Sequence, residues 1–186
     1  MSFLSEFFGK AHPSTRWQEI PDFPVLLDLS RHSLCNFRIG DPVDWFSGLG
    51  PPEDPKGGRL GNYTYFSKGL EVYAEKGAVE GFAVIFLDDS RPEFGPFPGE
   101  ILYDGRALEL GHAAGETGLT EIFGKPYWRD QDEQEAILFY EWIGDIEWQV
   151  EFSLDNFLKC ILITSPPLLS RPAQRKAYGV TKPWPP

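Results

Sequence analysis

A chain of 186 residues with 41% hydrophobic and 15% aromatic residues can bury a core of its own, which excludes an intrinsically disordered protein. Its 28 acidic and 17 basic residues give a net charge of −11, and such a surface repels the phosphate backbone of nucleic acids. The composition therefore predicts a globular protein that does not bind nucleic acids directly.

The first ten residues predict a short helix, because Phe3, Leu4, Phe7 and Phe8 fall on one helical face. We expect this helix to dock on the core. The alternative is a membrane-surface or partner helix, but the segment lacks the Lys/Arg face that anionic lipid favours. It also lacks the basic start of a signal peptide, so we expect a cytoplasmic protein that does not bind a membrane.

The two cysteines, Cys35 and Cys160, both fall in expected strands. A disulfide between them is the alternative, although two cysteines make no dense framework of the kind found in secreted domains. We therefore expect two buried, free thiols in a reducing compartment.

The first half of the chain opens with an extended, proline-rich stretch at 12–24 and a short helix or strand at 25–32. A short strand is expected at 34–39. A short helix follows at 41–49, with Asp41 as the N-cap and Pro42 at the first helical position. Gly50 and Pro52 then stop the helix, because glycine takes the left-handed conformation and proline cannot continue it. After a polar loop at 53–61, strands are expected at 63–66, 70–75 and 79–87.

The second half repeats this order of elements. A short strand is expected at 107–110 and a helix at 115–123, which ends at Gly124 and Pro126. The helix has apolar residues at helical spacing, namely Leu119, Ile122 and Phe123. A polar loop at 127–135 leads to expected strands at 137–143, 146–152 and 157–163. The second of these strands alternates apolar and polar residues throughout, and the third is apolar on both faces except for Lys159.

We interpret the repeated order as an internal duplication of segments 34–88 and 106–164, joined by a proline-rich linker at 89–99. The alternative is a chance repetition of a helix followed by a meander. The predicted fold is α+β and sheet-dominated, a duplicated short helix plus antiparallel β-meander, and residues 1–186 form a single globular unit.

A resemblance that covers residues 34–164 rests on the element order and on two stops, Leu49-Gly50-Pro51-Pro52 and Phe123-Gly124-Lys125-Pro126. This part of the chain resembles the β-lactamase-inhibitor-protein-like and SmpA/OmlA-like group, in which a short helical element packs on an antiparallel sheet, sometimes in tandem. Unlike the bacterial lipoproteins of that group, this chain is expected to have no signal peptide and no lipidated N-terminal cysteine. The resemblance implies a sheet offered to a protein partner and no catalysis. The element order is also similar to that of some small bacterial immunity proteins.

Charge is unevenly distributed along the chain. Residues 108–165 hold 12 acidic and 3 basic residues, a net charge of −9, whereas residues 166–186 hold four basic residues and no acidic one. This C-terminal tail contains six prolines and no predicted core, so we expect it to wrap over the surface or stay loose. The alternative is that the basic tail folds back on the acidic second copy.

The sequence contains no cofactor or catalytic signature, so we expect a non-catalytic protein without a cofactor. His12, His32 and His112 fall in no metal-binding spacing, and we expect solvated or capping roles for them. Four carboxylates cluster at 130–135, but the glycine and the distant glutamate of a calcium loop are missing there. We expect a solvated loop and no metal site, with a weak cation site as the alternative.

Aromatic residues next to acidic ones indicate a binding surface, since tryptophan and tyrosine anchor interfaces and acids steer a basic partner. We therefore interpret the protein as an interaction module, inhibitor- or immunity-like, whose partner is a basic protein. The predicted partner-binding residues are Tyr127, Trp128, Asp130, Asp132, Glu133, Glu135, Glu147 and Glu151. The alternative is a small enzyme or ligand-binding protein with a pocket between the two copies.

Overall fold

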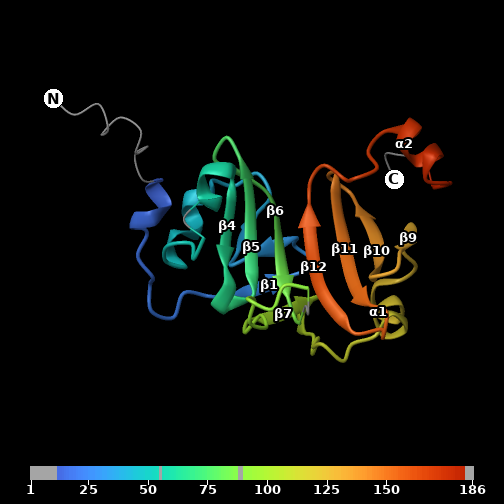
Figure 1. Cartoon of the computed structure of the whole chain (residues 1–186), viewed down its shortest axis with the longest axis horizontal. Coiled ribbons are helices and arrows are strands. Elements are labelled where there is room, and N and C mark those ends of the chain that lie inside the picture. The colour runs from blue at the N-terminus through green and yellow to red at the C-terminus, as the bar shows by residue number, and fades with distance from the viewer. Residues whose placement is uncertain (1–11, 55, 88–89, 183–186) are drawn as a thin grey trace.

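Two β-sheets face each other in the computed structural model, which describes residues 12–54, 56–87 and 90–182 (Figure 1). The larger sheet is antiparallel, and its strand order is β4-β5-β6-β12-β11-β10-β9. Its strands are β4 (Asn62–Tyr65), β5 (Leu70–Glu75), β6 (Ala78–Ile85), β9 (Trp128–Gln131), β10 (Glu135–Trp142), β11 (Ile146–Ser153) and β12 (Leu158–Thr164).

The smaller sheet has the strand order β3-β2-β1-β7-β8, and Figure 1 shows β1 and β7 behind the larger sheet. Its strands are β1 (Leu26–Asp28), β2 (Ser33–Leu34), β3 (Phe37–Arg38), β7 (Glu100–Tyr103) and β8 (Arg106–Ala107). The α-helices are α1 (Glu116–Phe123) and α2 (Pro172–Ala177). The 3-10 helices are η2 (Pro13–Arg16), η3 (Val43–Gly48), η4 (Gly57–Leu60) and η5 (Phe66–Lys68). This arrangement confirms the predicted sheet-dominated α+β class.

Alternating side chains explain how the larger sheet packs on the smaller one. In β11, Trp148, Val150 and Phe152 are fully buried, because successive residues of a strand point to opposite faces. They belong to the main core, which also contains Leu27 of β1 and Ile101 of β7. The opposite face of the larger sheet carries a much smaller apolar cluster.

The last strands of the two expected copies, β6 and β12, pair in the middle of the larger sheet, where Ile161 lies opposite Val84. Each expected copy therefore contributes three neighbouring strands to one continuous sheet. β5 has its expected bounds, and the other five of these strands lie within two residues of theirs. The duplication itself stays a prediction.

The expected strand at 34–39 is wrong, because it is split into the hairpin strands β2 and β3. Cys35 and Asn36 form the turn with φ angles of 53° and 67°, the left-handed values that a tight hairpin requires. Asp41 also does not cap the next helix, since Pro42 is the N-cap of η3 and the Asp41 carboxylate accepts the Arg38 N–H at 2.8 Å. Local polar contacts thus replace the expected cap.

The linker and the tail contribute buried residues, although no core was predicted in the tail. Phe94 and Phe97 in the linker are buried, and so are Leu169 and Arg175 in the tail. The expected helix at residues 1–10 lies outside the described residues. Within the ranges that the structure describes, no helix has the length and apolar character needed to cross a membrane.

Candidate functional site

Strand β9 is an edge strand of the larger sheet and carries the first predicted site residues. The expectation of a polar loop at 127–135 is wrong here, because residues 128–131 pair with β10. Contacts with neighbouring elements hold this polar segment in place. The ring of Trp128 stacks on Phe139 with centroids 4.4 Å apart, and Arg129 Nε donates to Glu116 Oε1 at 2.9 Å.

Three of the predicted acids, Asp130, Asp132 and Glu133, are exposed at the end of β9 and in the turn that follows. The Asp132 carboxylate shapes that turn, since Oδ1 accepts the N–H groups of Gln134 at 2.7 Å and of Glu135 at 3.0 Å. These two hydrogen bonds lower the pKa of Asp132. We call Asp130, Asp132 and Glu133 the acidic turn.

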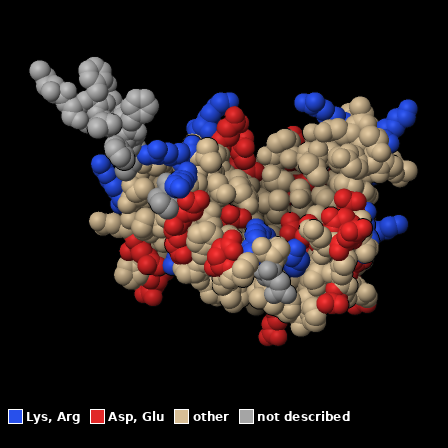
Figure 2. All heavy atoms as spheres, viewed as in Figure 1, with Lys and Arg blue, Asp and Glu red and all other residues tan. Residues whose placement is uncertain are grey.

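Two further predicted acids make contacts within the sheet. Glu135 Oε2 accepts from Lys159 Nζ at 2.6 Å. Glu151 is half-buried and lies opposite Cys160 of β12. Figure 2 shows acidic side chains on both halves of the face in view.

Glu147 is fully buried, although the alternation of β11 predicts a solvent-facing position. Both oxygens of its carboxylate accept hydrogen bonds. Tyr127 OH donates to Oε2 at 2.6 Å, while Gln149 Nε2 and the Leu168 N–H donate to Oε1 at 2.8 and 3.2 Å. Burial raises the pKa of Glu147, and these hydrogen bonds act in the opposite direction. Leu168 belongs to the C-terminal tail, so the tail covers this predicted site residue.

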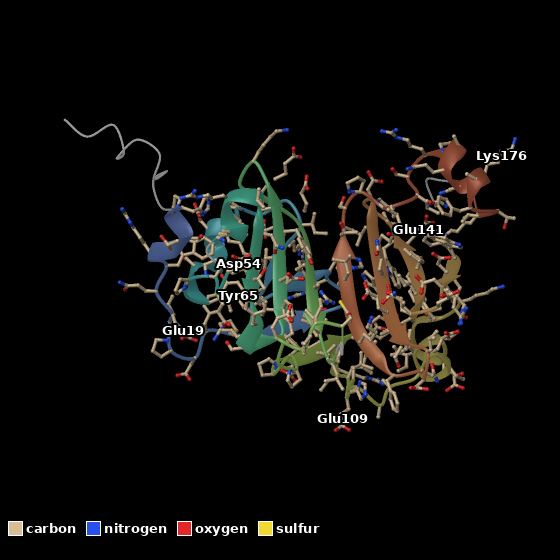
Figure 3. The ribbon with its side chains drawn as sticks, viewed as in Figure 1. Glu19, Asp54, Tyr65, Glu109, Glu141 and Lys176 are labelled. Atoms are coloured by element: carbon tan, nitrogen blue, oxygen red, sulfur yellow. The ribbon has the colours of Figure 1, made fainter. Side chains whose placement is uncertain are left out.

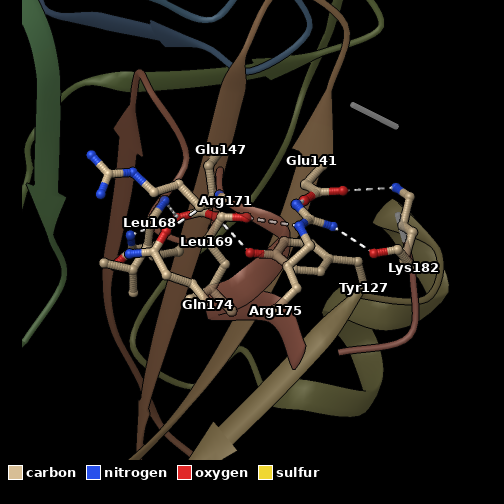
Figure 4. A network of polar contacts seen from close by, with 10 residues as sticks. Tyr127, Glu141, Glu147, Leu168, Leu169, Arg171, Gln174, Arg175 and Lys182 are labelled. Atoms are coloured by element: carbon tan, nitrogen blue, oxygen red, sulfur yellow. Dashed lines mark hydrogen bonds and ion pairs between the residues drawn. The ribbon is translucent and has the colours of Figure 1, made fainter. Parts of the chain in front are cut away.

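A second buried carboxylate, Glu141 on β10, is the residue that the sequence analysis missed. Its side chain has no exposed area and forms ion pairs with Arg175 and with Lys182, whose Nζ lies 3.2 Å from Oε2 (Figure 4). Arg175 is itself only 3% exposed. Its guanidinium lies over the ring of Tyr127, 5.0 Å from the centroid. We call Tyr127, Glu141 and Glu147 the arginine site.

The tail reaches this site because residues 166–182 fold into an ordered segment, called the C-terminal segment below. Pro172 occupies the first turn of α2, and Gln174 Oε1 accepts the Arg171 N–H at 3.2 Å. Arg175 Nε donates to Leu169 O at 2.7 Å and Nη1 donates to Lys182 O at 2.9 Å. The basic tail therefore folds back on the acidic second half. This is the alternative that the charge distribution along the sequence suggested. Figure 3 shows Glu141 close to α2 and Lys176 on its outer side.

The predicted site is thus divided between the two ends of β10. The acidic turn precedes Glu135 at one end, and Glu141 lies at the other end, about 20 Å away at the ordinary rise of a strand. Trp128 lies between them, and its ring is 5.3 Å from that of Tyr178 in the C-terminal segment. The arginine site is occupied by the chain itself, whereas the acidic turn is open to solvent.

A groove of about 620 Å³ lies near the junction of the two halves, within the size range of small-molecule sites. Leu87, just after β6, lines it together with His112, Phe157 and Lys159. The rings of His112 and Phe157 stack with centroids 4.5 Å apart. This groove combines apolar walls with groups that can carry charge.

The histidines and cysteines divide between expected and unexpected roles. His12 caps η2, as expected, since Nδ1 accepts the Ser14 N–H at 3.4 Å. His32 is neither solvated nor capping, because its Nδ1 accepts from Trp148 Nε1 at 3.0 Å. Both thiols are free and buried. Burial raises the pKa of Cys35 to about 12 and also raises that of Cys160. Among the described residues, no three His, Cys, Asp or Glu side chains are grouped to hold a metal ion.

Comparison with known proteins gives little information beyond this geometry. No protein-family profile matches the chain, and no curated protein matches its sequence significantly. Among solved structures, the chain is similar to a DUF4309 family protein, YjgB of Bacillus subtilis, with 13% identity and a TM-score of 0.45. The match covers 69% of this chain and 79% of that chain. The resemblance drawn from the two Gly-x-Pro stops stays a prediction.

Proposed function

We propose that the protein is a non-catalytic interaction module, inhibitor- or immunity-like, that binds a basic protein in the cytoplasm. The observation that carries this proposal is the chemistry of the β9–β11 edge of the larger sheet. Two carboxylates, Glu141 and Glu147, are buried there beside Tyr127, and a basic segment of the chain is already seated on them. A surface that holds one basic segment has the charge and the aromatic contacts to hold another.

The acidic turn supplies the second part of this proposal. Asp130, Asp132 and Glu133 are exposed next to the half-buried ring of Trp128. Exposed carboxylates raise the association rate of a positively charged partner, and their effect decreases with salt. We infer that these acids steer the partner toward the edge of the sheet. The two free thiols support the cytoplasmic assignment, because paired cysteines are typical of secreted proteins.

Affinity capture from a lysate of the source cells tests this proposal when three forms of the protein serve as bait. The first is the wild type, and the second carries Asp130→Asn, Asp132→Asn and Glu133→Gln. The third is a control with the same net charge, which carries Asp44→Asn, Glu80→Gln and Glu93→Gln at exposed positions of the first half and the linker.

A basic protein retained at low salt by the wild type and the control, but lost from the acidic-turn variant and at high salt, is the expected result. An equal loss of retention in both variants would show that overall charge, and not the acidic turn, captures the protein, and unchanged retention in both would exclude the acidic turn as the site. Because the two variants have the same net charge, the comparison separates a local site from general electrostatic attraction.

The groove near the junction of the halves favours a second function, the binding of a small ligand. Its combination of aromatic and aliphatic walls with Lys159 and His112 is suited to an amphipathic molecule that carries charge. A thermal-shift screen of such compounds tests this function. A ligand of the groove should raise the Tm of the wild type, and the increase should be lost in a Leu154→Asp variant, since Leu154 is 54% exposed on the groove wall.

A further inference from the structure

The arginine site has the features that distinguish recognition of arginine from recognition of lysine. A guanidinium is planar, so it can pair with a carboxylate while one face lies against an aromatic ring, whereas an ammonium acts as a compact point charge. Arg175 makes both contacts, with the Glu141 carboxylate and with the ring of Tyr127. Lys182 is 5.9 Å from the same ring and has a side chain that is 40% exposed, so it occupies the outer part of the site.

The C-terminal segment is held in place by few buried groups. Of its residues, Pro167, Leu169 and Arg175 are buried, and the others are exposed or half-buried. Among the described residues, the main core contains no side chain beyond Ile163, and the last strand ends at Thr164. Removal of the segment therefore leaves both sheets and their shared core in place.

The charged contact also adds little to the attachment of the segment. Transferring a carboxylate and a guanidinium out of water costs several kcal/mol for each ion, and their attraction in the protein about balances that cost. The contact is therefore selective for a cation without being a strong attachment. A second cationic segment that reaches Glu141 restores the same pairing, and so the exchange leaves no buried charge unpaired.

Displacement of the segment would uncover three of the eight predicted partner-binding residues. The carboxylate of Glu147 loses the Leu168 N–H, Tyr127 loses the guanidinium above its ring, and Trp128 loses its contact with Tyr178. The uncovered surface would have two carboxylates and two aromatic rings on neighbouring strands. Its preferred ligand is a basic segment that supplies one arginine and a main-chain N–H.

We propose that the C-terminal segment is a displaceable occupant of the arginine site, and that an arginine of the partner's basic segment takes the place of Arg175. This inference rests on the proposed function, since it names the partner's chemistry and the contact that keeps the site closed without a partner. The segment then acts as an internal competitor, so only a basic segment that binds Glu141 and Tyr127 better than the chain's own Arg175 opens the site.

A fluorescent peptide with the sequence of residues 166–182 is the probe for this proposal, and fluorescence anisotropy is the measurement. The full-length protein is used as the wild type and as the Arg175→Gln variant, in which the internal competitor is weakened. We expect the peptide to bind the variant at least tenfold more tightly than the wild type. The same peptide with Arg175→Lys should bind the variant at least tenfold more weakly than the unmodified peptide.

A second form of the protein keeps the test valid if the Arg175→Gln variant does not fold. A protease recognition sequence inserted between Ser165 and Pro166 allows the segment to fold in place and then to be cut from the wild-type chain. The labelled peptide should replace the cut segment, and the Arg175→Lys peptide should replace it far less well. Near-ultraviolet circular dichroism should show that the tryptophan environment of the core stays native after exchange.

Several outcomes would overturn the proposal. Equal binding of the arginine and lysine peptides would exclude an arginine site, and a cut segment that cannot be exchanged would exclude displacement. A concentration-dependent dimer of the wild type that exchanges segments would identify a second copy as the occupant. If the peptide experiments fail but the acidic-turn variant is still defective in capture, the proposed function stands. Peptide exchange without any captured basic protein would instead show that the segment is displaceable and would count against the proposed basic partner.

Discussion

Replacing Tyr127 with phenylalanine removes one hydroxyl group and tests whether the buried Glu147 is charged. The hydroxyl donates to Glu147 Oε2 at 2.6 Å, and the ring stays in place under Arg175. A hydrogen bond to a charged group contributes about 1.5–3 kcal/mol, and one between neutral groups contributes about 1 kcal/mol. The variant should therefore lose about 2 kcal/mol of unfolding free energy at pH 8. For a chain of this length, that loss lowers Tm by about 4–8 °C.

The dependence of this loss on pH follows from the pKa of Glu147. Burial raises the folded-state pKa of Glu147 above its ordinary value of 4.5, so its stability contribution is present below pH 4.5 and is lost as pH rises through the folded pKa. In the Tyr127→Phe variant the folded-state pKa of Glu147 rises further, so the stability contribution of Glu147 continues to decrease up to a higher pH. The difference between wild type and Tyr127→Phe should therefore decrease from about 2 kcal/mol at pH 8 to about 1 kcal/mol at pH 4.

Urea unfolding of both proteins between pH 4 and pH 8 measures this difference, and contributions from other titrating groups cancel in the comparison. The control is the same substitution in a Glu147→Gln background, where the difference should not depend on pH. A difference that stays constant across the range in the Glu147 background would refute the reasoning. It would mean that the Glu147 carboxyl keeps one protonation state throughout.

Three further predictions concern the stability of the fold and the reactivity of its buried thiols. Trp148 Nε1 donates to His32, and burial lowers the pKa of His32, so the free energy of unfolding should fall as pH drops below 6.5. The His32→Asn variant should show a smaller fall in urea titrations, and asparagine tolerates the φ of 49° at this position. Gly81→Ala would place a methyl group 2.8 Å from Ile163 O in the central strand pair and should lower the free energy of unfolding by about 1–3 kcal/mol. In contrast, the methyl group of Gly118→Ala in α1 meets no other atom, and this variant should gain up to about 1 kcal/mol. Thermal unfolding measures both changes. Cys35 and Cys160 should react with a disulfide reagent at pH 8 only at the rate of unfolding, because both are buried and burial raises the pKa of each thiol.

The strands of the larger sheet could be predicted because each half-buried strand shows its burial as an alternation of residue types. In β11, Trp148, Val150 and Phe152 face the core and are apolar, so the period of two is visible without a structure. The edge strand β9 has no such alternation, because its exposed residues need no apolar face. Its pairing depends on Phe139 of β10 and on Glu116 of α1, which no local pattern reveals.

The candidate site could be predicted only in part, for a related reason. Alternation correctly places Glu147 on the face opposite Trp148, but it cannot show that a segment more than twenty residues later covers that face. Glu141 and Arg175 are each unremarkable in sequence and become a buried pair only when the tail returns to β10. The available signal was the charge asymmetry, since an acidic half precedes a tail with no acid.

The polar character of the arginine site matters more for selectivity than for stability. An apolar contact of the same size would hold the tail more firmly, because it would lack the desolvation cost of two ions. It would also leave a hydrophobic patch when the tail departs, and such patches bind many surfaces without discrimination. A buried carboxylate is instead unfavourable when it has no cation beside it, and it is satisfied by a cation that also fits over the ring of Tyr127. The pair between Glu141 and Arg175 thus closes the site against most surfaces while leaving it open to a better-placed arginine.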